Sequence, residues 1–246
     1  MITDRRSLLK TAAAASTAGA LPWRSARAQA ANTIKLGLII DMSGTYRDIT
    51  GPTSVAATRL AIQEFAGRGF NVELVFGDHQ NKPDVGVAMA RQWLDRDGVD
   101  ALIDVGTSSV ALAVNEVCRE RNKVHLNSSA ATTDLTGPRC SPNTVHWTYD
   151  TWMLANSTGG AMVRAGGDSW FFITADYTFG HTLEQQTGGF VRGAGGRVVG
   201  SVRTPFPGTT DFSSFLLQAQ ASRAKVIGLA NAGADTINCI KQAAEF

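Results

Sequence analysis

The stretch ALIDVGTSSVALAV, residues 101–114, decides the fold of this protein. It begins with a short apolar run that is typical of a buried β-strand, continues through the turn formers Gly106 and Thr107, and then enters an apolar pattern of helical type. A buried strand that leads through a turn into a helix is half of a βαβ unit. The stretch therefore predicts a parallel sheet that is covered by helices.

The same alternation extends on both sides of this stretch. Helical spacing of apolar residues predicts covering helices over residues 55–65 and 85–94, and a further helix over residues 152–164. Seven β-branched or aromatic runs predict strands at residues 34–40, 72–78, 101–105, 123–127, 169–175, 197–204 and 224–230. The fold class is therefore α/β, with parallel sheets flanked by helices.

The rhythm of strands and helices breaks between the fourth and fifth predicted strands. Residues 133–151, TDLTGPRCSPNTVHWTYDT, are rich in turn formers and predict a crossover between two lobes. We place the lobe boundary near Tyr149, which gives an N-terminal lobe of residues 31–149 and a partial C-terminal lobe of residues 150–246. The last apolar helical pattern is still running at Phe246, and we expect that the second half of the fold is missing from this chain.

The N-terminus has the composition of an export signal. Arg5 and Arg6 precede a short, Ala-rich apolar run that is too short to span a bilayer stably. The pair resembles a twin-arginine motif, and the small residues around Gln29 predict cleavage near Ala30. We expect a signal peptide over residues 1–30 and a periplasmic protein; a basic amphipathic helix on a membrane, or a membrane anchor, is the alternative.

Composition narrows the possible functions. The net charge of the 246-residue chain is +2, and the predicted signal peptide holds five basic residues and one acidic residue, so about −2 remains and nucleic acid is not an expected partner. Three cysteines in an oxidising compartment allow at most one disulfide, whose pairing the spacing does not determine. The four histidines are scattered, and the sequence contains no metal-ligand spacing. Without a nucleotide-binding or hydrolase fingerprint, we expect no cofactor and no enzymatic activity.

In an open parallel sheet, ligands bind at the carboxyl ends of the strands. Ser108 and Ser109 stand where a helix begins, so that their hydroxyls and free backbone N–H groups suit a carboxylate. Residues 128–132, SSAAT, repeat this arrangement after the next strand. Tyr46 and Tyr177 occupy the corresponding loops of the two lobes, where aromatic rings can enclose an apolar ligand body. Helix capping is the alternative role for the serines, and packing is the alternative for the tyrosines.

Four segments in this order resemble the periplasmic substrate-binding proteins of ABC importers for branched-chain amino acids and related molecules. They are IKLGLIIDMSGTYRDITGP (34–52), DHQNKPDVGVAMARQWLDRDGVDALIDVGTSSVALAV (78–114), VHLNSSAATTDLTG (124–137) and WFFITADYTFGHTLEQQ (170–186). The resemblance implies a two-lobed Venus-flytrap fold of the type I class that presents its ligand to a membrane permease and that is monomeric at full length. It also implies that the ligand carboxylate binds at Ser108 or Ser109 and at Ala130 and Thr132, and that Tyr46 and Tyr177 are the aromatic positions.

The sequence departs from this family in two respects. Ala232 and Gly233 stand near a position where amino-acid binders of the family often have an aromatic residue, and members of the family are considerably longer. The hypothesis is that the protein captures a small carboxylate-bearing ligand, an amino acid or a related organic acid, and delivers it to an ABC permease. A ligand-sensing domain of the same fold and an exported α/β enzyme remain as alternatives. For the enzyme, Asp41, Asp78 and Asp104 near strand ends suggest a phosphoacceptor pocket.

Overall fold

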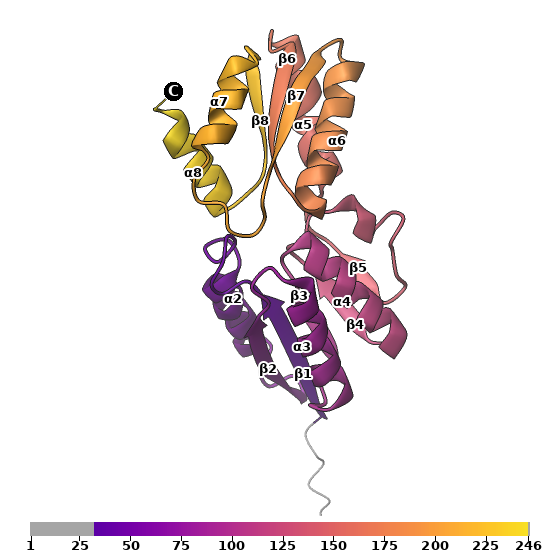
Figure 1. Ribbon diagram of the computed structural model, residues 1–246. Helices are drawn as coiled ribbons and strands as arrows, with labels where there is room; N and C mark the ends of the chain where they lie inside the picture. The colour runs from indigo at the N-terminus through magenta and orange to yellow at the C-terminus, as the bar shows by residue number, and fades with distance from the viewer. Residues whose placement is uncertain (1–31, 246) are drawn as a thin grey trace, which may run out of the picture. The chain divides into compact units, whose positions relative to one another are not determined.

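Two parallel β-sheets with helices on both faces make up the part of the chain that the structure describes, residues 32–245 of a computed structural model (Figure 1). This confirms the predicted α/β fold class. The predicted signal peptide, its paired arginines and its cleavage site lie outside the described residues.

The first sheet contains five strands in the order β2-β1-β3-β4-β5. All seven predicted strands are present within a few residues, and the structure adds one that the sequence did not predict, the three-residue β5. The strands of this sheet are β1 (Asn32–Ile40), β2 (Phe70–Asp78), β3 (Ala101–Asp104), β4 (Val124–Asn127) and β5 (Thr144–His146).

Helices cover both faces of this sheet. Helices α3 (Pro83–Asp95) and α4 (Ser108–Arg121) pack on one face around buried residues such as Leu102 and Val110, while α2 (Gly51–Glu64) lies against the other face beside Leu38. Each fully buried side chain of this size contributes about 1.5–3 kcal/mol relative to an exposed one. This apolar burial holds the loops at the strand ends in fixed positions.

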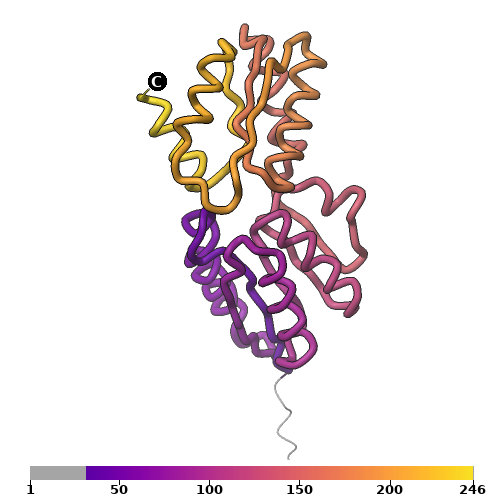
Figure 2. The backbone as a smooth tube through the Cα atoms, viewed as in Figure 1, coloured from indigo at the N-terminus to yellow at the C-terminus, as the bar shows by residue number. Residues whose placement is uncertain are grey.

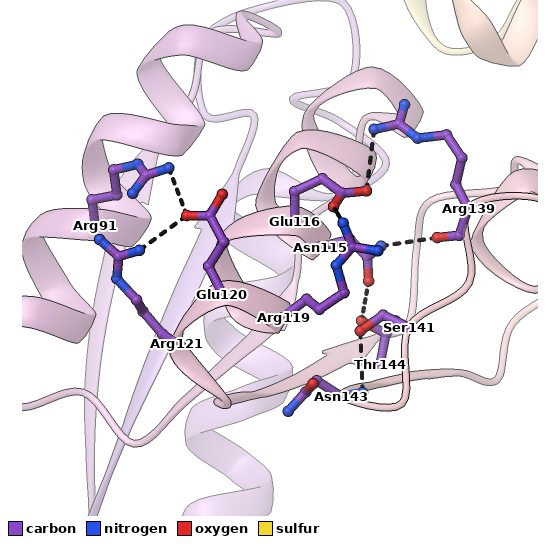
Figure 3. Close-up of polar contacts among 10 residues, drawn as sticks. All are labelled: Arg91, Asn115, Glu116, Arg119, Glu120, Arg121, Arg139, Ser141, Asn143 and Thr144. Carbon is purple, nitrogen blue, oxygen red and sulfur yellow. Dashed lines mark hydrogen bonds and ion pairs between the residues drawn. The ribbon is translucent and has the colours of Figure 1, made fainter.

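Polar contacts attach the short strand β5 to α4 (Figure 3). The side chain of Asn115 donates a hydrogen bond to the carbonyl of Arg139 at 3.0 Å and accepts one from the hydroxyl of Thr144. Beside it, Glu120 accepts hydrogen bonds from Arg91 and Arg121, each at 2.9 Å. β5 thus pairs with β4 and is tied to α4 through Thr144; its three residues form no apolar run, which is why the sequence pattern did not reveal it.

The second sheet contains three strands in the order β7-β6-β8, namely β6 (Ser169–Ala175), β7 (Arg197–Thr204) and β8 (Val226–Ala230). Helices α5 (Thr151–Arg164) and α6 (Thr178–Gly193) pack around Phe172 on one face, and α7 (Ser213–Ala221) and α8 (Ala234–Ala243) pack around Phe171 on the other. The chain path in Figure 2 passes between the sheets after β5 and before α5. The exact lobe boundary near Tyr149 stays a prediction.

All three cysteines are free thiols, with Cys118 and Cys239 buried and Cys140 exposed. The single disulfide that the sequence allowed is therefore not formed. No helix among residues 32–245 combines the length and the apolar character that crossing a membrane requires.

Candidate functional site

The order of strands in the first sheet points to a binding site at its carboxyl edge. β1 lies between β2 and β3, so the loops that follow β1 and β3 turn to opposite faces and leave a crevice between them. The parallel register sets Ile39 beside Asp104, and Ile103 beside Leu126, so these strands end at nearly the same level. Loops from three neighbouring strands therefore meet at this edge.

A cavity of about 190 Å³ lies where these loops meet loops of the second sheet. The side chains that line it come from the segments after β1, β3, β4, β5, β6 and β8. They are Tyr46, Ile49, Thr50, Gly106, Ser108, Ser128, Ser129, Ala131, Tyr149, Tyr177, Phe179 and Ala232. An apolar wall with a few convergent polar groups is the usual composition of a small-molecule site.

Asp41 shapes the loop after β1. This carboxylate is only 1% exposed and accepts hydrogen bonds from the backbone N–H groups of Gly44 at 2.7 Å and Tyr46 at 2.8 Å, and from the side-chain amide of Asn81 at 2.6 Å. These bonds replace the solvation that a buried carboxylate loses. They also fix the position of Tyr46, a cavity-lining residue that is 4% exposed.

All three tyrosines of the chain line this one cavity. The hydroxyls of Tyr46 and Tyr177 are hydrogen-bonded to each other, and the ring of Tyr177 stacks on Phe206 with ring centres 4.0 Å apart. Burial raises the pKa of both phenols above the usual range, so they are neutral at any physiological pH. Tyr46 and Tyr177 therefore supply aromatic walls and neutral hydroxyls but no charge.

The beginning of α4 supplies the groups that suit an anion. Ser108 is 2% exposed, lines the cavity and stands at the first position of the helix. Thr107, which precedes it, makes no side-chain cap bond to the helix, and its hydroxyl donates to the side-chain carbonyl of Asn81. The N–H groups of the first turn thus have no side-chain cap and lie at the positive end of the helix dipole. Such a terminus attracts a carboxylate.

The loop after β4 is organised around Asp104. The side-chain amide of Asn127 donates to the carbonyls of Asp104 at 2.8 Å and Val105 at 3.1 Å, and both of these residues have left-handed backbone angles, with φ of 69° and 54°. The hydroxyls of Ser128, at 3.0 Å, and Ser129 donate to the same carboxylate oxygen of Asp104. Ser128 and Ser129 line the cavity, and the acidic side chain lies behind them.

The predicted site residues divide into two groups. Tyr46, Ser108 and Tyr177 line the cavity; Ser109, Ala130 and Thr132 do not. Ala130 and Thr132 are fully buried, and the hydroxyl of Thr132 accepts a hydrogen bond from the N–H of Asp134, where it caps a short 3-10 helix, η1 (Thr133–Leu135). The role of each residue in ligand binding stays a prediction.

Sequence reasoning missed several residues of the cavity. Thr50 and Tyr149 carried no recognisable motif, and Ser128 and Ser129 belong to the predicted SSAAT loop but were not among the residues predicted to hold the ligand. The three aspartates considered for a phosphoacceptor pocket do not line this cavity. Residues 32–245 also contain no group of three or more histidine, cysteine or acidic side chains that could hold a metal ion.

A second, larger cavity of about 530 Å³ lies between α2 and the first sheet. It is lined mainly by apolar side chains, including Phe65 and Phe70, and it shares Ser128 and Ser129 with the smaller cavity. Of these two cavities, the smaller one combines loops of both sheets with Ser108 at the uncapped beginning of α4. We therefore take the smaller cavity as the candidate site.

Comparison with known proteins finds the same fold in periplasmic and other solute-binding proteins. A periplasmic binding protein from Burkholderia mallei is 49% identical with a TM-score of 0.84, over 88% of this chain and 58% of its own. A branched-chain amino acid ABC transporter periplasmic ligand-binding protein from Burkholderia xenovorans is 40% identical with a TM-score of 0.69. The match covers 87% of this chain and 57% of the Burkholderia xenovorans protein. A solute-binding protein of an ABC transporter from Rhodopseudomonas palustris HaA2, in complex with p-hydroxybenzoic acid, is 27% identical with a TM-score of 0.71. The match covers 85% of this chain and 57% of the Rhodopseudomonas palustris protein.

This chain thus spans somewhat less than three fifths of the length of these solved structures. A search of curated protein sequences finds no match. The sequence profile of the family described as periplasmic binding protein matches residues 33–246, which include every strand of both sheets apart from the first residue of β1 and every residue of the cavity. The chain therefore belongs to the periplasmic binding protein family.

Proposed function

We propose that this protein is an extracytoplasmic solute-binding protein that captures a small carboxylate-bearing ligand and delivers it to an ABC permease. The observation that carries the proposal is the uncapped first turn of α4, with Ser108 buried at the edge of a cavity whose walls are tyrosines. The helix terminus can bind the carboxylate, and the aromatic rings can enclose the body of the ligand.

The relatives suggest which ligands to test first. One is named for branched-chain amino acids, and another was solved with p-hydroxybenzoic acid; both kinds of molecule carry a carboxylate. The cavity of about 190 Å³ favours a small molecule of either kind. A binding role for Tyr46, Ser108 and Tyr177 belongs to this proposal.

Changing Ser108 to alanine tests the proposal directly. Removing one buried hydrogen bond to a charged group costs about 1.5–3 kcal/mol, so we expect Ser108→Ala to weaken binding by roughly ten- to a hundredfold. Isothermal titration calorimetry with L-leucine and with 4-hydroxybenzoate measures this. Ser109→Ala is the matched control, since Ser109 is the next residue of the same helix but does not line the cavity. Equal affinities of the two variants would contradict the proposed carboxylate site.

We also propose that the protein is exported and cleaved after Ala30. The paired arginines and the small residues before Ala31 support this proposal. Mass spectrometry of periplasmic material should find a chain that begins at Ala31, and replacing Arg5 and Arg6 by lysine should retain the precursor in the cytoplasm. Export that is unchanged by both substitutions would rule out the twin-arginine route, and an intact Met1 in the membrane fraction would contradict cleavage.

A further inference from the structure

Asn81 joins three loops at the carboxyl edge of the first sheet. It lies in the loop after β2, is only 3% exposed and does not line the cavity. Its side-chain N–H donates to Oδ2 of Asp41 in the loop after β1 at 2.6 Å, and its side-chain oxygen accepts from the hydroxyl of Thr107 in the loop after β3. Because β1 lies between β2 and β3, this side chain spans the crevice beside which Tyr46 and Ser108 line the cavity.

The backbone of this loop fixes where the amide of Asn81 lies. Gln80 and Asn81 both have left-handed angles, with φ of 53° and 58°, a region in which asparagine is enriched. The N–H of Asn81 donates to Nδ1 of His79 at 2.9 Å. Burial lowers the pKa of His79 to about 4, so at neutral pH this nitrogen keeps the lone pair that accepts. A Cβ atom on Gly44 would lie 2.6 Å from Nδ2 of Asn81, so the amide is also confined from that side.

The contacts of Asn81 determine what the hydroxyl of Thr107 does. A carboxylate only accepts hydrogen bonds, so the amide must turn its N–H to Asp41 and its oxygen to Thr107. Thr107 is the N-cap residue of α4 and has the extended backbone that is usual at that position. A threonine there ordinarily accepts from the N–H of the second or third helical residue, here Ser109 or Val110, but Thr107 makes no such bond.

The first turn of α4 also contains a buried hydroxyl without a partner. Ser108 is 2% exposed and lines the cavity, and its side chain makes no hydrogen bond to any of residues 32–245. Buried polar groups in proteins are nearly always hydrogen-bonded, so this hydroxyl points to a partner that enters the cavity. It lies with the uncapped N–H groups at the positive end of the helix dipole, which favours a carboxylate. A capping bond from Thr107 would take one of these N–H groups from the ligand.

We propose that Asn81 is a positioning residue for ligand binding: by holding the hydroxyl of Thr107 it keeps that hydroxyl from capping α4 and leaves the first-turn N–H groups to the ligand carboxylate. This inference rests on the proposed function, because it takes the carboxylate to lie at the beginning of α4. Without the oxygen of Asn81, rotation about the Cα–Cβ bond of Thr107 would bring its hydroxyl to the helix. A ligand would then have to displace the capping bond that forms.

Removing the side chain of Asn81, and then the hydroxyl of Thr107, tests this role. Glycine is the suitable replacement for Asn81, since it adopts a left-handed backbone without strain. We expect Asn81→Gly to weaken the binding of L-leucine or 4-hydroxybenzoate roughly fivefold, the effect of one capping bond, by isothermal titration calorimetry. In Asn81→Gly/Thr107→Val, valine keeps the shape of threonine but cannot cap, so the affinity should return to within about twofold of the native value. A defect of packing alone would not be rescued in this way.

Amide hydrogen exchange, followed by nuclear magnetic resonance, reports the same change without a ligand. In Asn81→Gly, the N–H of Ser109 or Val110 should become more protected than in the native protein, because the hydroxyl of Thr107 now accepts from it. Adding Thr107→Val should remove that protection.

Asn115→Ala is the control. Asn115 is another fully buried asparagine whose side chain bonds two other segments, at the carbonyl of Arg139 and the hydroxyl of Thr144, but it does not line the cavity. This variant should keep the native affinity and the native exchange at the beginning of α4, whatever it does to stability. If Asn81→Gly fails to fold, Gly44→Ala displaces the same amide, and Thr107→Val should rescue its binding likewise.

The outcomes distinguish this inference from the proposed function. Native affinity in Asn81→Gly, unchanged exchange of both amides, or weakened binding that Thr107→Val does not restore would each overturn the role of Asn81. None of these results touches the carboxylate site, on which Ser108→Ala reports separately. Equal affinities of Ser108→Ala and Ser109→Ala, or a native protein that binds neither ligand, would overturn the proposed function and this inference with it.

Discussion

Asn127 shows how one buried side chain can determine the geometry of a site. Its side-chain N–H groups donate to the carbonyls of Asp104, the last residue of β3, and of Val105, which follows it, and its side-chain oxygen accepts from the N–H of Ala130 at 3.0 Å. A left-handed conformation is unusual for Asp104 and more so for the β-branched Val105, and such angles persist only where the surroundings hold them. Asn127 provides these bonds, and they direct the carboxylate of Asp104 to the serines of the next loop.

Buried histidines control how stability depends on pH. Burial lowers the pKa of His79 and of His125 from 6.5 to about 4, so both are neutral in the folded protein, whereas both gain a proton on unfolding at any pH between these values. Their contribution to stability is therefore complete above pH 6.5 and is lost as the pH falls towards 4. Asp235 changes stability with pH in the opposite direction. Burial raises its pKa from 3.8 to about 6, so between these values its carboxyl loses a proton on unfolding.

We predict that the free energy of unfolding decreases by about 1.4 kcal/mol per pH unit between pH 6 and pH 4.5, because two histidines gain protons on unfolding and Asp235 loses one. Urea unfolding at several pH values measures the slope. His125→Gln should nearly abolish it, and Asp235→Asn should steepen it. An unchanged slope in both variants would show that these groups do not titrate as their burial requires.

At the scale of elements, close backbone contacts fix how the beginning of α6 packs on the second sheet. Gly180 lies in the first turn of α6, and a Cβ atom there would be 2.1 Å from the carbonyl oxygen of Ala175 and 2.9 Å from that of Ala230. These atoms belong to the ends of β6 and β8, so they cannot move without distorting the sheet. Gly189, in the same helix, has no neighbouring atom within 4 Å of the corresponding position.

Two glycine-to-alanine substitutions in α6 should therefore act in opposite directions. Gly180→Ala should destabilise the protein by several kcal/mol, because either the helix or a strand end must shift. Gly189→Ala should stabilise it by roughly 0.5–1 kcal/mol, since alanine loses less backbone entropy in a helix. Thermal and urea unfolding of the two variants test this. A stabilised Gly180→Ala variant would show that α6 can move away from the strand ends.

For the molecule as a whole, contacts between distant segments join the two sheets at the candidate site. The hydroxyls of Tyr46 and Tyr177 pair across 131 residues of sequence, and the N–H of Ala234 donates to the carbonyl of Thr45 at 3.0 Å. Further away, the side-chain amide of Gln186 donates to the hydroxyl of Thr133 at 2.8 Å. The walls of the cavity therefore depend on how these segments meet.

A double-mutant cycle measures the coupling between the two tyrosines. Tyr46→Phe and Tyr177→Phe each remove one hydroxyl and leave the other without its partner, so their effects on the free energy of unfolding should not add. We predict an interaction energy of about 1 kcal/mol, the usual net value of one hydrogen bond. Thr58→Val, which removes a part-buried hydroxyl of α2 that bonds within its own helix, should add independently to either change. Additive effects of the two tyrosine changes would contradict the contact.

The sequence by itself determined the fold class and the neighbourhood of the site. Apolar runs alternating with helical patterns predict strands within a few residues of those observed, because burial on both faces of a parallel sheet requires such runs. Parallel strands also have their carboxyl ends at one edge, and this rule located the loops that contain Tyr46, Ser108 and Tyr177. β5 could not be predicted, since it has only three residues and no apolar run; it pairs with β4, and its Thr144 bonds Asn115 of α4.

Only the tertiary structure decided which hydroxyls face the ligand and in which sense they bond. Ser108 and Ser109 are equivalent in sequence, but successive residues of a helix point about 100° apart, and the packing of α4 on the first sheet turns only Ser108 to the cavity. Similarly, Ser128 and Ser129 read as donors until the left-handed backbone of Asp104 brings its carboxylate behind them. Both outcomes depend on contacts between residues that are distant in the chain, and local pattern carries no information about such contacts.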